Sequence, residues 1–249
     1  DSPPDSVLSP SDFTDQGNMG LHSLEGLEQF TIWKTNFYLG TTVKHSTADG
    51  VTWSEVLVSN NAYDGTGLPL FKKIQYGAGK YVAVNGNPDT AITSPWYSTD
   101  GNEWAYCTFT PSANEDTVKT ITFGGGKFIA AGTPSGTSLV YSSSDGIAFT
   151  QVATVSFGGY EGLEWTGTNY VMVSNRHAAY SPDGVSWSVY WIDGSTTWSR
   201  QSCLKAGVYL TYSNAAVAQK IGISTDNGES FTVYGASAMA GHKIMTIWS

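Results

Sequence analysis

One motif, Ser/Thr-x-Asp-Gly-x-x-aromatic, recurs along the chain and constrains its fold more than any other feature. We call it the Asp motif. It spans residues 47–53, 98–104, 143–149 and 181–187, and a copy that is one residue longer spans 224–231. The aspartates of successive copies are 51, 45, 38 and 43 residues apart, counted from Asp49 through Asp100, Asp145 and Asp183 to Asp226. A period of this length is typical of proteins built from stacked structural repeats.

Each Asp motif lies within a longer repeat of strand-like segments. A Gly- or Asn-containing turn, followed by an aromatic residue and small apolar residues, precedes the motif at 36–40, 79–83, 126–130, 168–172 and 207–211. A further strand precedes this segment, as at 72–76 and 119–123, and another follows the motif, as at 53–57 and 149–153. Four strands in about 45 residues is the size of one propeller blade. The sequence therefore predicts an all-β fold, a five-bladed β-propeller of four-stranded antiparallel blades.

The two ends of the repeat region carry the same tripeptide. Thr31-Ile32-Trp33 matches Thr246-Ile247-Trp248, and each stands where the first strand of a blade is expected. We therefore expect the terminal strands to pair within one blade and close the ring, although a truncated six-bladed propeller fits the same pattern. Residues 1–20 contain three Pro and four Asp and little apolar material, which predicts an arm or linker ahead of a propeller at 21–249.

The Asp motif resembles the Asp-box, also called the bacterial neuraminidase repeat, of sialidase-like β-propellers. Residues 224–231 match the usual Ser-x-Asp-x-Gly-x-Ser/Thr-Trp/Phe form, and the other four copies are a variant one residue shorter. The resemblance covers roughly residues 24–249. It implies a propeller in which each motif joins the third and fourth strands of its blade. Because Asp-boxes occur in enzymes, lectins and scaffolds alike, the resemblance does not fix a function.

The residue types of the motif suit a structural role in that turn. Asp and Ser side chains accept hydrogen bonds from the backbone N–H groups that a tight turn exposes, and Gly supplies a positive φ. The aromatic side chain fills the space between neighbouring sheets. No spacing of acidic residues matches a calcium loop, so we predict no metal site. The predicted structural residues are Asp49, Trp53, Asp100, Trp104, Asp145, Phe149, Asp183, Trp187, Asp226 and Phe231.

The catalytic set of a sialidase-like enzyme is missing from the chain. Enzymes of that family hold the substrate carboxylate with three arginines, and this chain contains only Arg176 and Arg200. Lysine does not replace arginine in such bidentate contacts. There is also no G-x-S-x-G nucleophile motif. We therefore predict no catalytic residue, no cofactor and no enzymatic activity.

Charge and hydropathy exclude two further classes. The chain has 21 acidic and 12 basic side chains and a formal net charge of −9, with no Lys/Arg cluster, which argues against binding to the phosphates of nucleic acid. No apolar run reaches the ~20 residues that span a bilayer, so we predict no membrane insertion.

Ligand-binding residues are expected in the loops at the end of the blades opposite the Asp motifs. These loops differ most in sequence from one repeat to the next, as binding loops on a fixed scaffold tend to do. The loop at 191–200 combines two tryptophans with an aspartate and an arginine. Aromatic rings that receive the apolar face of a sugar, next to carboxylates that bind its hydroxyls, suit carbohydrate binding. The candidates are Trp191, Asp193, Trp198, Arg200, Trp96, Asp89, Tyr63, Asp64, Tyr160 and Arg176, with Glu161 and His177 beside them.

These observations predict a non-enzymatic binding or structural domain. The leading interpretation is an interaction module displayed on a larger assembly, such as a phage tail-fibre or capsid-decorating protein, since the Gly-Lys-Phe-Ile-Ala and Tyr-Ser-x-Asp-Gly segments resemble phage-borne repeats. Its partners would be other protein subunits or a cell-surface glycan, and its location a virion, the cell surface or the extracellular space. The alternatives are a carbohydrate-binding lectin and, third, a glycoside hydrolase using Asp64 with Glu161 or Asp89 with Asp193.

Overall fold

The computed structural model describes residues 30–36, 41–47, 52–60, 71–85, 95–110, 118–132, 137–156, 162–174, 177–192, 198–205, 208–213 and 220–235. Most of these residues lie in strands. The chain divides into two compact units, residues 1–106 and 107–249, which are described one after the other.

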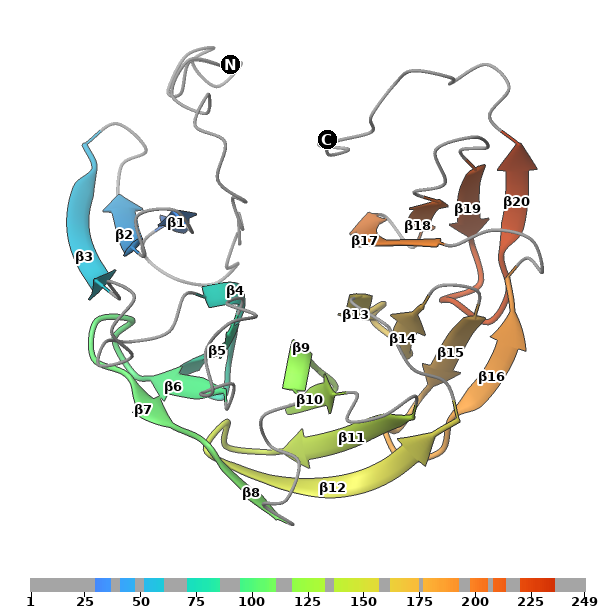
Figure 1. Cartoon of the computed structure of the whole chain (residues 1–249), viewed down its shortest axis with the longest axis horizontal. Helices are drawn as coiled ribbons and strands as arrows, with labels where there is room; N and C mark the ends of the chain where they lie inside the picture. Colours follow the sequence, from blue (N-terminus) through green and yellow to red (C-terminus); the bar gives the residue numbers. More distant parts are fainter. Residues whose placement is uncertain are drawn as a thin grey trace. The chain divides into compact units, whose positions relative to one another are not determined.

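The first unit contains two antiparallel sheets (Figure 1). The first sheet consists of β1 (Phe30–Asn36), β2 (Thr41–Thr47) and β3 (Ser54–Asn60), in that order. The second consists of β4 (Phe71–Gly77), β5 (Lys80–Asn85), β6 (Trp96–Ser98) and β7 (Ala105–Tyr106). In both sheets each strand pairs antiparallel with the next along the chain.

The second unit contains three sheets (Figure 1). The first consists of β8 (Thr108–Thr110), β9 (Val118–Gly124), β10 (Lys127–Gly132), β11 (Ser138–Ser143) and β12 (Ala148–Val155), with strand order β8-β12-β11-β10-β9. The second is β13 (Gly162–Trp165), β14 (Tyr170–Val173), β15 (His177–Ser181) and β16 (Ser188–Trp191). The third is β17 (Trp198–Lys205), β18 (Val208–Ser213), β19 (Lys220–Ser224) and β20 (Thr232–Gly235).

The central sheet of this unit, β13–β16, buries both of its faces. Alternate residues of a strand point to opposite faces, so each face packs against a different neighbouring sheet. One face packs against β10–β12 in a cluster of Ile129, Ala131, Val140, Val155, Leu163, Tyr170, Met172 and Ala179. The other packs against β20 and the Asp motif before it, in a cluster of Val171, Val173, Ala178, Ile192, Phe231 and Val233. This two-sided burial explains why β14 is apolar at every position.

The all-β prediction with antiparallel four-stranded sheets is confirmed, but two sheets depart from the predicted count. The sheet that contains β9–β12 has a fifth strand, β8, which runs parallel to β12. The sheet of β1–β3 has three described strands.

The strand assignment at the start of the repeat region was wrong. Thr31–Trp33 was predicted to be a first strand and 36–40 the second. Instead β1 is continuous to Asn36 and pairs along its whole length with β2, the strand that leads into the Asp motif. It therefore occupies the second-strand position, and no first strand of this sheet lies among the described residues.

Candidate functional site

The Asp motifs are one candidate for a functional site, and their geometry is best seen around Asp183, between β15 and β16. Its Oδ1 accepts hydrogen bonds from the backbone N–H groups of Val185 and Ser186, both at 2.8 Å. The Ser181 hydroxyl donates to the same oxygen at 2.9 Å and accepts from the Gly184 N–H at 2.8 Å. The carboxylate is thus occupied by the turn that contains it.

The same contacts recur in the other described motifs. Oδ1 of Asp100 accepts a hydrogen bond from the Asn102 N–H at 2.8 Å, and Oδ1 of Asp145 accepts one from the Ile147 N–H at 2.8 Å. Oδ1 of Asp226 accepts one from the Ser230 N–H at 3.0 Å. The longer fifth copy fits its extra residue by placing both Asn227 (φ 59°) and Gly228 (φ 83°) in the left-handed region. Asp49 of the first copy lies outside the described residues.

The motif also docks its sheet against the preceding one. A Cβ added to Gly184 would stand 2.6 Å from Ile129 Cδ1, and at Gly228 it would stand 2.2 Å from Val171 Cγ2. Gly184 has φ 71°, so both the backbone conformation and the close packing require glycine. The Lys127 ammonium donates to the Asp183 carbonyl at 2.6 Å, which adds a polar contact between the two sheets. These contacts give the motif a structural role.

The carboxyl groups of the motif carry lowered pKa values, which makes stability depend on pH. The N–H groups of Ser186 and Val185 lower the pKa of Asp183 to about 2. Bonds from Asn102 and Ile147 likewise lower the pKa of Asp100 and Asp145. Burial raises the pKa of Asp226, but the hydrogen bonds from Ser230, Ser224 and the backbone of Asp226 together lower it below its ordinary value.

We predict that the free energy of unfolding falls as the pH drops from about 5 to about 2. A carboxyl group whose pKa is lower in the folded state stabilises the fold above its unfolded pKa of about 3.9 and loses this effect as it is protonated. Urea unfolding at a series of pH values measures the slope. Asp183→Asn should reduce it, because the amide does not titrate; an unchanged slope in this variant would contradict the assignment.

The predicted ligand-binding residues fall into three groups. Six lie outside the described residues: Tyr63, Asp64, Asp89, Tyr160, Arg176 and Asp193. Trp198 and Arg200 belong to β17, where only the backbone is described. Trp96 and Trp191 have described side chains, and the structure places them in contrasting environments.

Trp96 lies in the core, although the sequence placed it in a binding loop. It is the first residue of β6 and only 7% exposed. Its ring centroid is 3.9 Å from that of Tyr106, and it belongs to a cluster with Phe71 and Ile74. Trp96 is already part of β6, and its indole packs into the core instead of lining a loop. It is therefore not part of the candidate site.

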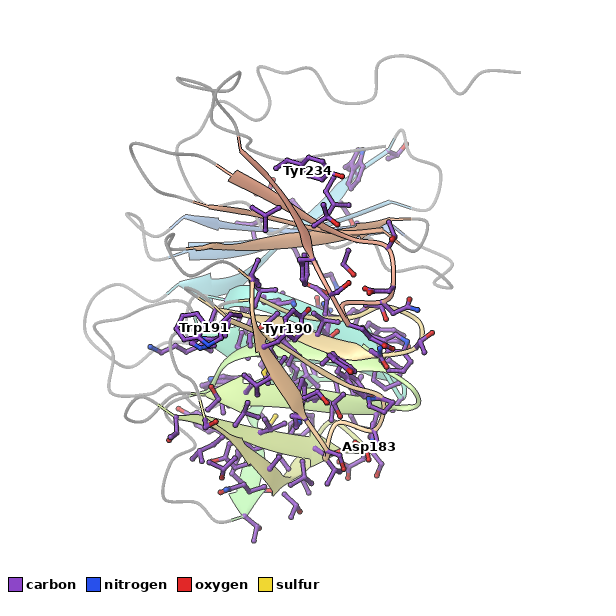
Figure 2. All side chains as sticks on the ribbon, turned by 90° about the vertical axis from the view of Figure 1, so that its right-hand side faces the viewer. Asp183, Tyr190, Trp191 and Tyr234 are labelled. Carbon is purple, nitrogen blue, oxygen red and sulfur yellow. The ribbon has the colours of Figure 1, made fainter. Side chains whose placement is uncertain are left out.

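Trp191 is the last residue of β16 and is 59% exposed. It lies at the end of β16 away from the turn that carries Asp183 (Figure 2). Its cross-strand partner is His177, at the start of β15, and the two ring centroids are 4.1 Å apart with planes tilted by 45°. The histidine ring thus supports the indole from the neighbouring strand, and sequence positions 14 residues apart meet at this edge.

Val189 extends the same exposed face. It is 40% exposed and lies two residues before Trp191, so both side chains point to one side of β16. Its cross-strand partner Ala179 is fully buried against the β10–β12 sheet. Val189 and Trp191 therefore lie on the face of the β13–β16 sheet that packs against β10–β12. Sequence reasoning missed Val189 because it treated Trp191 as the start of a loop, and the segment Ser-Val-Tyr-Trp carries no polar–apolar alternation that would have marked Val189 as exposed. We call Trp191, His177 and Val189 the β16 platform.

Tyr190 fixes the strand from its opposite face. Its hydroxyl donates to the Gly228 carbonyl of the next sheet's Asp motif, and its ring centroid is 6.5 Å from that of Phe231. In Figure 2 Tyr190 lies over the middle of β16, next to the exposed Trp191. One side of β16 is therefore held by the neighbouring sheet, while the outer part of the other side presents the β16 platform to solvent.

Among the described residues, no group of three or more His, Cys, Asp and Glu side chains is arranged to hold a metal ion. Within the same part of the chain, no helix has the length and hydropathy needed to cross a bilayer.

No protein-family model matches the chain, and no curated protein matches it in sequence. Solved structures do. The chain is similar to a structure of a nidogen/laminin complex, with a TM-score of 0.56 and 10% identity over 77% of this chain and 70% of that one. It is similar to the β-propeller domain of the trilobed protease from Pyrococcus furiosus, described as having an open velcro topology, with a TM-score of 0.51 and 8% identity over 88% of this chain and 70% of that one.

A third similar structure is a putative 6-phosphogluconolactonase from Bacteroides uniformis, with a TM-score of 0.53 and 12% identity over 86% of this chain and 68% of that one. The similar structures are β-propeller proteins. The likeness supports a β-propeller fold. Because sequence identities of 8–12% show a shared fold alone, nothing about the activity of this chain follows from the activities of these proteins.

Proposed function

We propose that the chain is a non-enzymatic binding domain, a five-bladed β-propeller of the Asp-box type displayed on a larger assembly such as a virion or a cell surface. The observation that carries this proposal is the exposed indole of Trp191, held by His177 at the end of its sheet away from the Asp motif. A rigid, half-apolar surface at the edge of a repeat scaffold suits recognition of a partner.

The occupied carboxylates of the Asp motifs favour binding over catalysis. A glycosidase requires two carboxyl groups facing each other across a cleft. The described aspartates instead each bind the backbone of their own turn, and they lie in separate sheets. The sialidase set of three arginines is also absent from the sequence. These observations support a scaffold that recognises rather than transforms its ligand.

The three-stranded sheet of the first unit supports a closed ring of five blades. Its strands β1, β2 and β3 occupy the second, third and fourth positions of a blade, because its Asp motif joins β2 to β3. The edge of β1 is where a first strand pairs in the four-stranded sheets. We propose that residues 243–248, which end in Thr246-Ile247-Trp248, supply this first strand and close the propeller.

We expect the fluorescently labelled chain to bind intact cells of some bacterial species, and Trp191→Ala to abolish this binding. Flow cytometry across a panel of Gram-negative and Gram-positive species measures it. Tyr234→Ala is the matched control, because Tyr234 is 55% exposed on β20, in the next sheet, and away from the β16 platform (Figure 2). Its binding should equal that of the unaltered chain.

Two results would overturn the proposal. One is the absence of cell binding across the panel. The other is binding that Trp191→Ala leaves intact, because the platform would then have no part in it. Both variants alter exposed side chains, so their thermal midpoints should match that of the unaltered chain and rule out unfolding as the cause.

A further inference from the structure

We propose that the β16 platform binds the apolar face of a neutral pyranose ring, as a terminal or internal unit of a glycan. This inference rests on the proposed binding function and names its ligand class. It begins from the indole of Trp191, whose 59% exposure leaves ring surface in contact with water. The C–H groups on one face of a pyranose pack well against such a ring, while the hydroxyls at the rim stay hydrated.

The platform is held in place before any ligand binds. His177 contacts the indole from the adjacent strand, with 4.1 Å between ring centroids, and the backbone of β16 pairs with β15 at this position. Tyr190, one residue earlier, is bonded to Gly228 on the opposite face of the strand. A fixed aromatic surface loses little conformational entropy on binding, which favours a weak ligand with few contacts such as a single sugar ring.

Charge favours a neutral ligand. The described residues of the β13–β16 sheet contain no Lys or Arg, and their only carboxylates are Glu164 and Asp183. Asp183 lies at the opposite end of β16 and accepts hydrogen bonds from its own turn. With a net charge of −9 for the whole chain, the field around the domain opposes an anionic glycan.

The size of the apolar surface favours a sugar over a protein partner. Trp191 and Val189 are the exposed large hydrophobic residues of β16, whereas the others in the described part of the chain lie elsewhere: Tyr106 on β7, Val185 in an Asp motif and Tyr234 on β20. A stable protein interface buries about 800 Å² on each partner, far more than two side chains provide. One or two sugar rings match this surface.

The test is a titration of the whole chain with four neutral tetrasaccharides built from glucose (β1,4 and α1,4), mannose and N-acetylglucosamine, followed by calorimetry. Sialyllactose and a heparin tetrasaccharide serve as anionic probes. We expect at least one neutral probe to bind with a Kd of about 1 mM or lower, and Trp191→Ala to weaken this binding at least about tenfold. Trp191→Phe, which keeps an aromatic face, should retain part of it, and Tyr234→Ala all of it.

Several outcomes would overturn the inference. They are the absence of binding to every neutral probe at about 10 mM, tighter binding of the anionic probes, and neutral binding that Trp191→Ala leaves unchanged. A dimer of the unaltered chain that Trp191→Ala converts to a monomer would show instead that a second copy covers the platform.

The two proposals fail separately. Cell binding that depends on Trp191 but that no neutral sugar inhibits would leave the binding function standing and remove the sugar as its ligand. Sugar binding at Trp191 without any cell binding would keep the site and remove the displayed role.

Discussion

Replacing Phe109 by alanine should lower the free energy of unfolding of the second unit by about 3–5 kcal/mol. Phe109 is the middle residue of β8 and is 6% exposed. Its ring stacks on Phe149, with 5.0 Å between centroids and an interplanar angle of 9°, and meets the edge of Tyr141 at 5.0 Å. Truncation removes these contacts and leaves a cavity at the outer edge of the β9–β12 sheet. Urea unfolding, followed by tryptophan fluorescence and circular dichroism, measures the loss.

The control for this variant is Tyr234→Ala, which removes an aromatic side chain of similar size that is 55% exposed, and should change the free energy by less than about 0.5 kcal/mol. Phe109→Leu, which keeps most of the buried volume, should cost less than the alanine variant. If Phe109→Ala costs no more than Tyr234→Ala, β8 does not contribute to the stability of the sheet.

The reason for the large effect lies in the pairing of β8 with β12 at the outer edge of the sheet. β7 leaves its own sheet after two residues, and the chain continues through the buried Cys107 into β8, which pairs in parallel with β12. The Thr108 N–H donates to the Ile147 carbonyl at 2.9 Å, at the start of this pairing. β8 thereby covers the outer edge of β12, an edge that would otherwise expose unpaired backbone groups.

The sequence predicts those features whose chemistry is local. The Asp motif could be recognised because its hydrogen bonds join residues two to four positions apart, as between Asp183 and Ser186, so the necessary residue types stand together in the chain. Strand order within the four-stranded sheets was predicted for the same reason, since each strand pairs with its neighbour along the chain. Because the motif recurs, recognising it once predicts the same strand–turn–strand arrangement in several sheets.

The features that the sequence did not predict depend on contacts between distant residues. The parallel pairing of Phe109 with Phe149 joins residues 40 positions apart, and no local pattern marks it. The burial of Trp96 depends on Tyr106, Phe71 and the point at which β6 begins. For the candidate site, Trp191 was identified by its type, whereas its support by His177 required the cross-strand register of β15 and β16.

The central proposal is that the repeats form one ring of five blades, and that the C-terminal segment supplies the first strand beside β1. Deleting residues 242–249 tests it most directly. If Ile244, Met245, Ile247 and Trp248 are buried in a first strand, at about 1.5–3 kcal/mol each, the truncated chain should lose about 6 kcal/mol or more of unfolding free energy. Deleting residues 1–20 is the matched control and should leave the urea midpoint unchanged. A 242–249 deletion that also leaves the midpoint unchanged would contradict the closed ring.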